Sequence, residues 1–266
     1  MFISLLPKSE YKSRWKYYYY YWWRFEQCGY TLSVDRKSIR IFNDRFTIAG
    51  ESPNTIWTSF GILCEHEYDF FDDKDYLMID IGLNIGVAAL WFAAKDNIRK
   101  VYGYEPFSQT FRQAAANLDN NFRFKDKIKI FNFGLGKTDK VVSIHYNPVL
   151  PGSMSTVKDL YPDIKKTPEQ VLIRPASAVL QPVFEQNTGL KKFVKIDCEG
   201  SELEILENLS ESGLLTAIDL IILEWHFGNV QQVVEILKRN GFMVTCRHTV
   251  PDFQGNIVAV SMLRRT

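Results

Sequence analysis

The segment from residue 76 to residue 105 constrains the fold of this 266-residue chain more than any other part of it. An apolar run ends in Asp80, and two glycines, Gly82 and Gly86, follow within six residues. A helical pattern comes next, and then a second short apolar run that ends in Glu105. This order predicts a β-turn-α-β unit in which an acidic residue closes each strand.

The glycine turn of this unit is typical of a nucleotide-binding edge. Glycine lets the chain turn tightly at the carboxyl end of a strand, so a ligand can approach the start of the next helix. Glu105 at the next strand tip is placed to accept both hydroxyls of a ribose. A dinucleotide fingerprint that starts at Gly82 needs glycine at positions 84 and 87, where the chain has Asn84 and Val87. The pattern therefore favours S-adenosylmethionine over NAD, with Asp80 near the charged amino group of the cofactor; the alternative is a βαβ unit that binds no nucleotide.

The bulk properties of the chain exclude several classes of protein. With a net charge of +1, the chain has no field that would attract a polyanion, so nucleic acid is not the expected partner. The cysteines form no CxxC pair and no metal-site spacing, which predicts reduced thiols in a cytoplasmic protein. No apolar segment reaches the roughly 20 residues that span a bilayer, and the N-terminus lacks the apolar core of a signal peptide. We therefore expect a soluble protein with no transmembrane segment.

Residues 1–70 are predicted to form a separate N-terminal region that caps the catalytic domain and could pair two copies of the chain. Residues 8–25 interleave basic and aromatic side chains. They predict either a helix on a membrane surface or an acidic polymer, or a helix packed against the chain or a partner. We favour the packed helix, because aromatic side chains on all faces spoil the amphipathic pattern. Residues 30–49 predict a β-hairpin, and residues 55–71 a helix that contains His66.

Residues 71–266 are predicted to form one catalytic domain. Strands alternate with helices and the chain closes with two consecutive strands, which predicts an α/β fold with a seven-strand, mostly parallel sheet and a terminal antiparallel hairpin. Ser108 is the expected N-cap of the helix that follows the β-turn-α-β unit. Residues 134–136 are expected to form a turn, and residues 147–170 a loop over the site. The further strands are expected at 127–133, 140–146, 192–197, 217–225, 242–248 and 256–263.

Four motifs together resemble the FkbM family of S-adenosylmethionine-dependent methyltransferases. They begin at Ile79, Tyr104, Val194 and Leu223, and the Lys-Ile-Asp-x-Glu-Gly-x-Glu block that ends at Glu202 is the most specific. The resemblance implies a class I, Rossmann-like methyltransferase fold, O-methylation, and substrates among sugars and natural products. The chain is rich in aromatic residues and lysine, and in this respect it is also similar to enzymes that modify bacterial surface polysaccharides, including methyltransferases of nucleotide-linked heptose in capsule synthesis. The predicted cofactor-binding residues are Asp80, Gly82, Asn84, Gly86, Glu105, Pro106 and Asp197.

Three side chains at the ends of two strands are the candidate catalytic residues. Methyl transfer to a hydroxyl is an in-line displacement that needs positioning and a base. Asp197 ends one predicted strand, and Glu224 and His226 end the next with side chains on the same side. Each has an alternative role: Asp197 and Glu199 as helix caps, Glu224 bound to a backbone amide or to the cofactor, and His226 at the edge of the core. An acidic pair with one imidazole could also hold a divalent ion, but the spacing is not diagnostic and we do not favour a metal site.

The sequence thus predicts a methyltransferase that acts on a sugar hydroxyl, with a nucleotide-activated sugar of surface polysaccharide synthesis as the expected substrate. A methyltransferase of another small-molecule hydroxyl, and a binding protein that keeps the fold without turnover, are the alternatives. A nucleic-acid methyltransferase is disfavoured, because the chain has neither an Asn/Asp-Pro-Pro-aromatic segment nor a Pro-Cys dipeptide.

Overall fold

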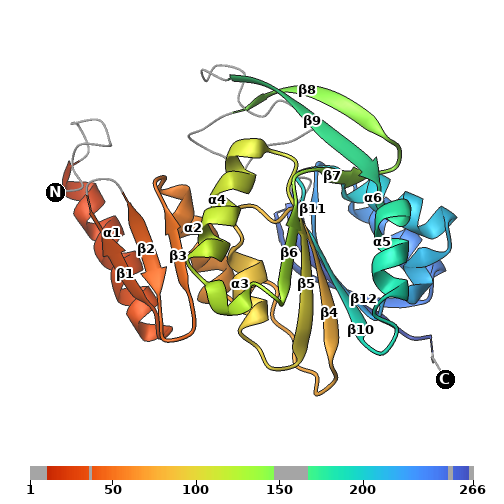
Figure 1. Cartoon of the computed structure of the whole chain (residues 1–266), viewed down its shortest axis with the longest axis horizontal. Helices are drawn as coiled ribbons and strands as arrows, with labels where there is room; N and C mark the ends of the chain where they lie inside the picture. Colours follow the sequence, from red (N-terminus) through yellow and green to blue (C-terminus); the bar gives the residue numbers. More distant parts are fainter. Residues whose placement is uncertain (1–10, 36–37, 147–166, 251–253, 264–266) are drawn as a thin grey trace.

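A seven-stranded sheet forms the centre of the computed structural model, which describes residues 11–35, 38–146, 167–250 and 254–263 (Figure 1). β13 runs antiparallel to both of its neighbours, and the other neighbouring strands are parallel. The predicted mostly parallel sheet with a terminal antiparallel hairpin is confirmed. In spatial order the strands are β12 (Phe242–Val250), β13 (Gln254–Ser261), β11 (Leu220–His226), β10 (Lys191–Ile196), β4 (Tyr76–Ile81), β5 (Ile98–Tyr104) and β6 (Ile128–Phe131).

Helices cover both faces of this sheet, as Figure 1 shows. Side chains alternate between the two faces along a strand, so in β4 Met78 packs in one core and Leu77 and Ile79 in the other. Burial on both faces explains why these strands are continuous apolar runs. None of the helices in the described part of the chain has the length and hydropathy to cross a bilayer. One face carries α2 (Asn54–Leu63), α3 (Val87–Ala93) and α4 (Ser108–Asp119), and the other α5 (Ala176–Glu185), α6 (Glu202–Glu211) and α7 (Val230–Arg239).

A small sheet lies over the carboxyl ends of the central strands (Figure 1). It consists of β7 (Gly134–Gly136), β9 (Thr167–Pro175) and β8 (Lys140–Tyr146). The predicted turn at Gly134–Gly136 is therefore wrong, because β9, far along the chain, supplies the strand that pairs with it. Of the loop predicted over 147–170, residues 147–166 lie outside the described part, and the last four residues belong to β9.

The N-terminal region adds a layer beyond α2 and α3. It comprises α1 (Tyr11–Gln27) and an antiparallel sheet of β1 (Thr31–Val34), β2 (Ile39–Phe42) and β3 (Thr47–Gly50). The predicted hairpin is the β2–β3 pair.

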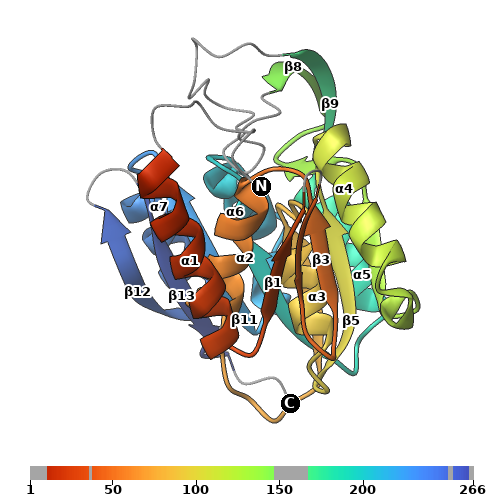
Figure 2. The same ribbon diagram turned by 90° about the vertical axis from the view of Figure 1, so that its left-hand side faces the viewer.

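Helix α1 packs against the rest of the chain, as the favoured interpretation predicts. Tyr21 and Phe25 contact the ring of Phe60 in α2 edge-on, and Figure 2 shows α1 in front of α2. Trp22 and Trp23 on its other side are exposed. The pairing of two copies through this region stays a prediction.

The N-terminal region shares its hydrophobic core with α3 and α4. The buried amide of Asn117 in α4 connects them: its Oδ1 accepts the N–H of Ala49, and its Nδ2 donates to the carbonyl of Ile85. The division of the chain at residue 70 stays a prediction.

Two predicted helix details are wrong. The helix predicted over 55–71 ends at Leu63, and His66 follows it with a positive φ of 56°. The chain turns there because Tyr68 is buried. Ser108 is not an N-cap but the first residue of α4, and its N–H donates to Oε1 of Glu169 in β9.

Candidate active site

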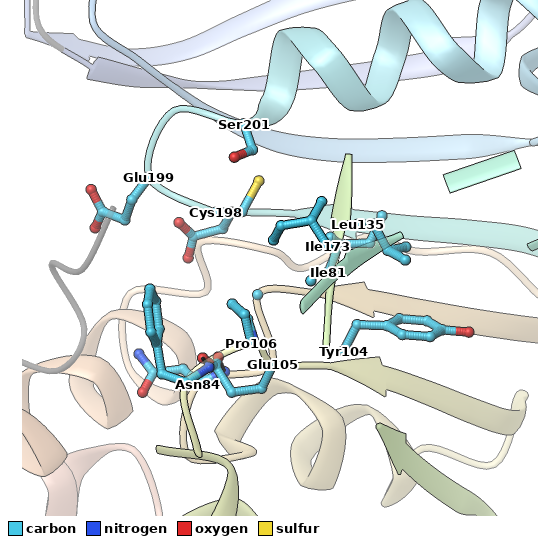
Figure 3. A pocket seen from close by; sticks show the side chains of 14 residues that line it. Ile81, Asn84, Tyr104, Glu105, Pro106, Leu135, Ile173, Cys198, Glu199 and Ser201 are labelled. Atoms are coloured by element: carbon cyan, nitrogen blue, oxygen red, sulfur yellow. Dashed lines mark hydrogen bonds between the residues drawn. The ribbon is translucent and has the colours of Figure 1, made fainter. Parts of the chain in front are cut away.

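A cleft opens at the carboxyl ends of β4, β5 and β10, beneath the small sheet. In Figure 3, Asn84 and Glu105 lie on one side of it and Glu199 and Ser201 on the other. Parallel α/β sheets bind ligands at this edge. The lining residues are Ile81, Gly82, Asn84, Tyr104, Glu105, Pro106, Phe107, Gly134, Leu135, Ile173, Asp197, Cys198, Glu199 and Ser201.

The glycine turn after β4 forms one wall of the cleft. Gly82, Asn84 and Gly86 all have positive φ, between 52° and 85°. The carbonyl of Tyr104 accepts the N–H groups of both Gly82 and Leu83, which ties the turn to the tip of β5. Side chains with a Cβ rarely adopt this backbone conformation, so the turn depends on its glycines.

We expect Gly82→Ala to lower the melting temperature and to abolish ligand binding in the cleft. A Cβ at Gly82 would stand 1.7 Å from the backbone carbonyl of Asp197, so β10 and the turn would have to separate. Gly29→Ala is the matched control, because Gly29 has nearly the same φ, 80°, and a Cβ added there would meet no atom within 4 Å. That control should lose only about 1–2 kcal/mol through backbone strain. Equal thermal shifts in the two variants, measured by circular dichroism, would contradict the steric argument.

Glu105 is held rigidly at the tip of β5. Its Oε2 accepts the N–H of Asn84 at 2.9 Å, and its Oε1 accepts the N–H of Phe107 at 3.0 Å. Burial raises its pKa to about 7, against the lowering effect of the two backbone donors. A carboxylate oxygen has two lone-pair sites, so each oxygen keeps one for a further donor.

Asp80 does not line the cleft, which differs from the sequence expectation. It is fully buried, and its Oδ1 lies 3.1 Å from the Nζ of Lys195. Burial raises the pKa of Asp80, and Lys195 opposes this effect. The charge of Asp80 is matched within the protein, so a contact with the amino group of a cofactor has no place in this arrangement.

Lys195 connects the residues around the turn. Its Nζ donates to the carbonyl of Gly82 at 2.6 Å and lies 3.6 Å from Oδ2 of Asp197, in addition to the pair with Asp80. The hydroxyl of Tyr68 donates to the same Oδ2 at 2.9 Å. Asp197 is thus fixed in direction while 26% of its side chain is exposed.

A second carboxylate, Glu202, fixes the position of His226. Its Oε1 accepts the N–H groups of Cys198 and Gly200, and it lies 2.9 Å from Nδ1 of His226. The other ring nitrogen of His226 lies 3.5 Å from Oε2 of Glu199. Glu202, and not Asp197 or Glu199, is therefore the carboxylate that accepts the backbone N–H groups of the loop before α6.

The charged groups around Asp197 shift one another's pKa. Burial would lower the pKa of His226, but the hydrogen bond to Glu202 and the nearby Glu199 raise it to about 9. Burial is the main cause that raises the pKa of Glu199 and of Glu224 to about 8, and the nearby Asp197 raises both further. The raised pKa of His226 favours its protonated form, and its role as a catalytic base stays a prediction.

The structure brings most predicted site residues together. Gly82, Asn84, Glu105, Pro106 and Asp197 line the cleft, whereas Gly86 is the N-cap of α3. Glu224 and His226 stand behind the lining, next to Glu199.

Residues 80–244 match the family described as the methyltransferase FkbM domain, which is more than half of the chain. The chain belongs to the FkbM methyltransferase family. Membership of this family means that the chain is a methyltransferase that uses S-adenosylmethionine as its cofactor.

Curated relatives of this FkbM protein include methyltransferases of varied origin. The methyltransferase sdnD of Sordaria araneosa is 24% identical over 209 residues, which cover 69% of this chain and 80% of that protein. The hexuronic acid methyltransferase AglP of Haloferax volcanii is 26% identical over 156 residues, or 59% of this chain and 58% of that protein. A crystal structure of methyltransferase FkbM from Methylobacillus flagellatus KT aligns with a TM-score of 0.47 at 18% identity, over 76% of this chain and 47% of that one.

The residues of this FkbM cleft fit the cofactor. Glu105 offers one free lone-pair site on each oxygen, which suits the two hydroxyls of a ribose. Gly82, which has no side chain, lines the cleft with it.

We expect Glu105→Ala to weaken S-adenosylmethionine binding by about tenfold or more, since a hydrogen bond to a charged group contributes about 1.5–3 kcal/mol. Isothermal calorimetry measures the loss. Glu169→Ala is the control, because Glu169 is also a carboxylate that accepts a backbone N–H, that of Ser108 in α4. Unchanged affinity in Glu105→Ala would contradict the assignment.

Two important residues were missed in the sequence. Lys195 is a lysine within an otherwise apolar buried strand, and such a charge needs a partner, which is the signal that could have found it. Glu202 stood in the most specific family motif, but nothing in the sequence linked it to His226, 24 residues away.

Proposed function

We propose that this chain transfers the methyl group of S-adenosylmethionine to a hydroxyl of a sugar, and that the sugar is nucleotide-activated and used in surface polysaccharide synthesis. The observation that supports this most is the position of Asp197. It is held by Lys195 and Tyr68 and partly exposed in the cleft, directly after β10, and only β4 separates β10 from β5, the strand that Glu105 follows.

The chemistry divides among the residues of the cleft. S-adenosylmethionine supplies a methyl group on a positively charged sulfur. Glu105 binds the ribose and so fixes the direction of the cofactor. Asp197 accepts the hydrogen bond of the acceptor hydroxyl and draws its proton during attack. Lys195 and Tyr68 keep the carboxylate aligned, which contributes through positioning.

The sugar acceptor is supported by a relative and by the charge of the site. AglP, a relative at 26% identity, is a hexuronic acid methyltransferase. Carboxylates such as Asp197 and Glu199 are common acceptors for sugar hydroxyls, since each oxygen accepts two hydrogen bonds. A natural-product hydroxyl has the same chemistry and is the alternative acceptor.

The test is methyl transfer to a panel of nucleotide sugars, with mass spectrometry of the products. A gain of one methyl group, and an equal yield of S-adenosylhomocysteine, is the expected result. If no nucleotide sugar gains mass while a natural product with a free hydroxyl group does, the sugar assignment fails. If S-adenosylmethionine binds and no acceptor of either kind reacts, a binding protein without turnover is the better description.

A further inference from the structure

We propose that Asp197, Glu199 and His226 bind one divalent metal ion, Mg²⁺ or Mn²⁺, at the carboxyl ends of β10 and β11. One ligand atom from each residue lies within 4.8 Å of the others. The role that we give the ion, to bind the acceptor hydroxyl, rests on the proposed function; the binding site itself does not.

The distances suit the first coordination shell of one ion. Two ligands that each lie about 2.1 Å from an octahedral ion are roughly 3.0 Å apart when adjacent and roughly 4.2 Å apart when opposite. Nε2 of His226 and Oε2 of Glu199 are 3.5 Å apart. An ion between the three groups therefore needs only a small contraction of the cluster.

The orientation of His226 is the second observation. Its Nδ1 is engaged by the buried Glu202 at 2.9 Å, and backbone N–H groups of Cys198 and Gly200 hold Glu202 in place. This arrangement directs Nε2 toward Glu199. Metal-bound histidines are commonly oriented in this way, by a carboxylate on the ring nitrogen that does not bind the metal.

The ligand types indicate which ions fit. Two carboxylates and one imidazole suit hard or borderline divalent ions. Binding places the ion where the Nε2 proton stands in the free protein. Asp197 and Glu199 line the cleft, so the open coordination positions face it. A hydroxyl bound there would be polarised and would lose its proton more readily.

The nearby charges make a cation favourable. Glu202 and Glu224 lie near the two carboxylate ligands, and the one lysine beside Asp197 in this part of the structure, Lys195 at 3.6 Å, also pairs with Asp80 at 3.1 Å. The structure also admits a rival arrangement without an ion, in which a charged His226 bridges Glu202 and Glu199.

Manganese binding to the full-length chain tests the proposal. The chelator-treated protein is titrated with Mn²⁺, and electron paramagnetic resonance measures the free ion. About one ion per chain should bind. Glu199→Gln and His226→Gln should weaken binding tenfold or more, on the scale of losses at metal sites. Glu204→Gln is the matched control, because Glu204 lies on α6 and pairs with Lys140; it should bind as the wild type does.

Two results would overturn the proposal: no bound Mn²⁺ up to millimolar concentration, or equal affinity in the wild type and Glu199→Gln. Thermal melts verify that each variant folds, and Asp197→Asn replaces any variant that does not. Methylation of nucleotide sugars at full rate in the presence of EDTA would overturn the catalytic role of the ion and leave the proposed function intact. One bound Mn²⁺ that is lost in Glu199→Gln, with no sugar methylated, would support the metal site while the sugar assignment fails.

Discussion

Asp197→Asn should lower kcat by about 10²–10⁴-fold, the range typical of a lost general base. The amide keeps the shape and still accepts the hydrogen bond of Tyr68. It loses the negative charge that draws the hydroxyl proton or that binds a metal ion, so kcat falls whether Asp197 acts as the base or as a metal ligand. Release of S-adenosylhomocysteine at saturating acceptor measures kcat.

Cofactor affinity separates this effect from a general loss of structure. Glu105 is untouched by the substitution, so calorimetry should give nearly the wild-type affinity for S-adenosylmethionine. Asp75→Asn is the control, because Asp75 forms an exposed pair with Arg99 and should change nothing measurable. Wild-type kcat in Asp197→Asn, with the chemical step limiting, would show that another group takes the proton.

Lys195→Met should destabilise the fold by about 3–5 kcal/mol, the range for removal of one partner of a buried ion pair. The lysine is 3% exposed and Asp80 is completely buried, so the substitution leaves a carboxylate with no counter-charge in the core. The carbonyl of Gly82 loses its donor as well. Urea unfolding at pH 7 measures the loss.

The pH dependence of this loss gives a second check. Burial raises the folded-state pKa of Asp80 above its ordinary value, and without Lys195 nothing opposes this effect. A group whose pKa is raised on folding stabilises the fold in its protonated form, so its contribution is present at low pH and disappears as the pH rises. The deficit of Lys195→Met should therefore be smaller at pH 4 than at pH 8.

Two further variants make the comparison specific. Lys191→Met removes an exposed lysine of the same strand and should stay within about 0.5 kcal/mol of the wild type. Asp80→Asn combined with Lys195→Met should recover part of the loss, because no charge is then buried. A wild-type unfolding midpoint in Lys195→Met would show that the pair does not stabilise the fold.

The sequence by itself determined the central unit and the sheet. The apolar strands, the glycine turn and the acidic strand tip at Glu105 are local features, so residues near one another in the chain predict them. The antiparallel position of the last strand followed from two consecutive strands at the end, because a short connection returns the chain in the opposite direction. Glu105 lies where its place after β5 predicted.

Only the tertiary structure decided features that depend on distant parts of the chain. Gly134–Gly136 is a strand because β9 pairs with it, and the helix before His66 ends early because Tyr68 turns inward to Asp197. The partners of Asp80 and His226, Lys195 and Glu202, come from segments that lie 115 and 24 positions away, as their numbers show. A charged residue within an apolar strand indicates from the sequence alone that it needs a partner. Which residue is that partner depends on how β4, β10, β11 and the loop before α6 pack together.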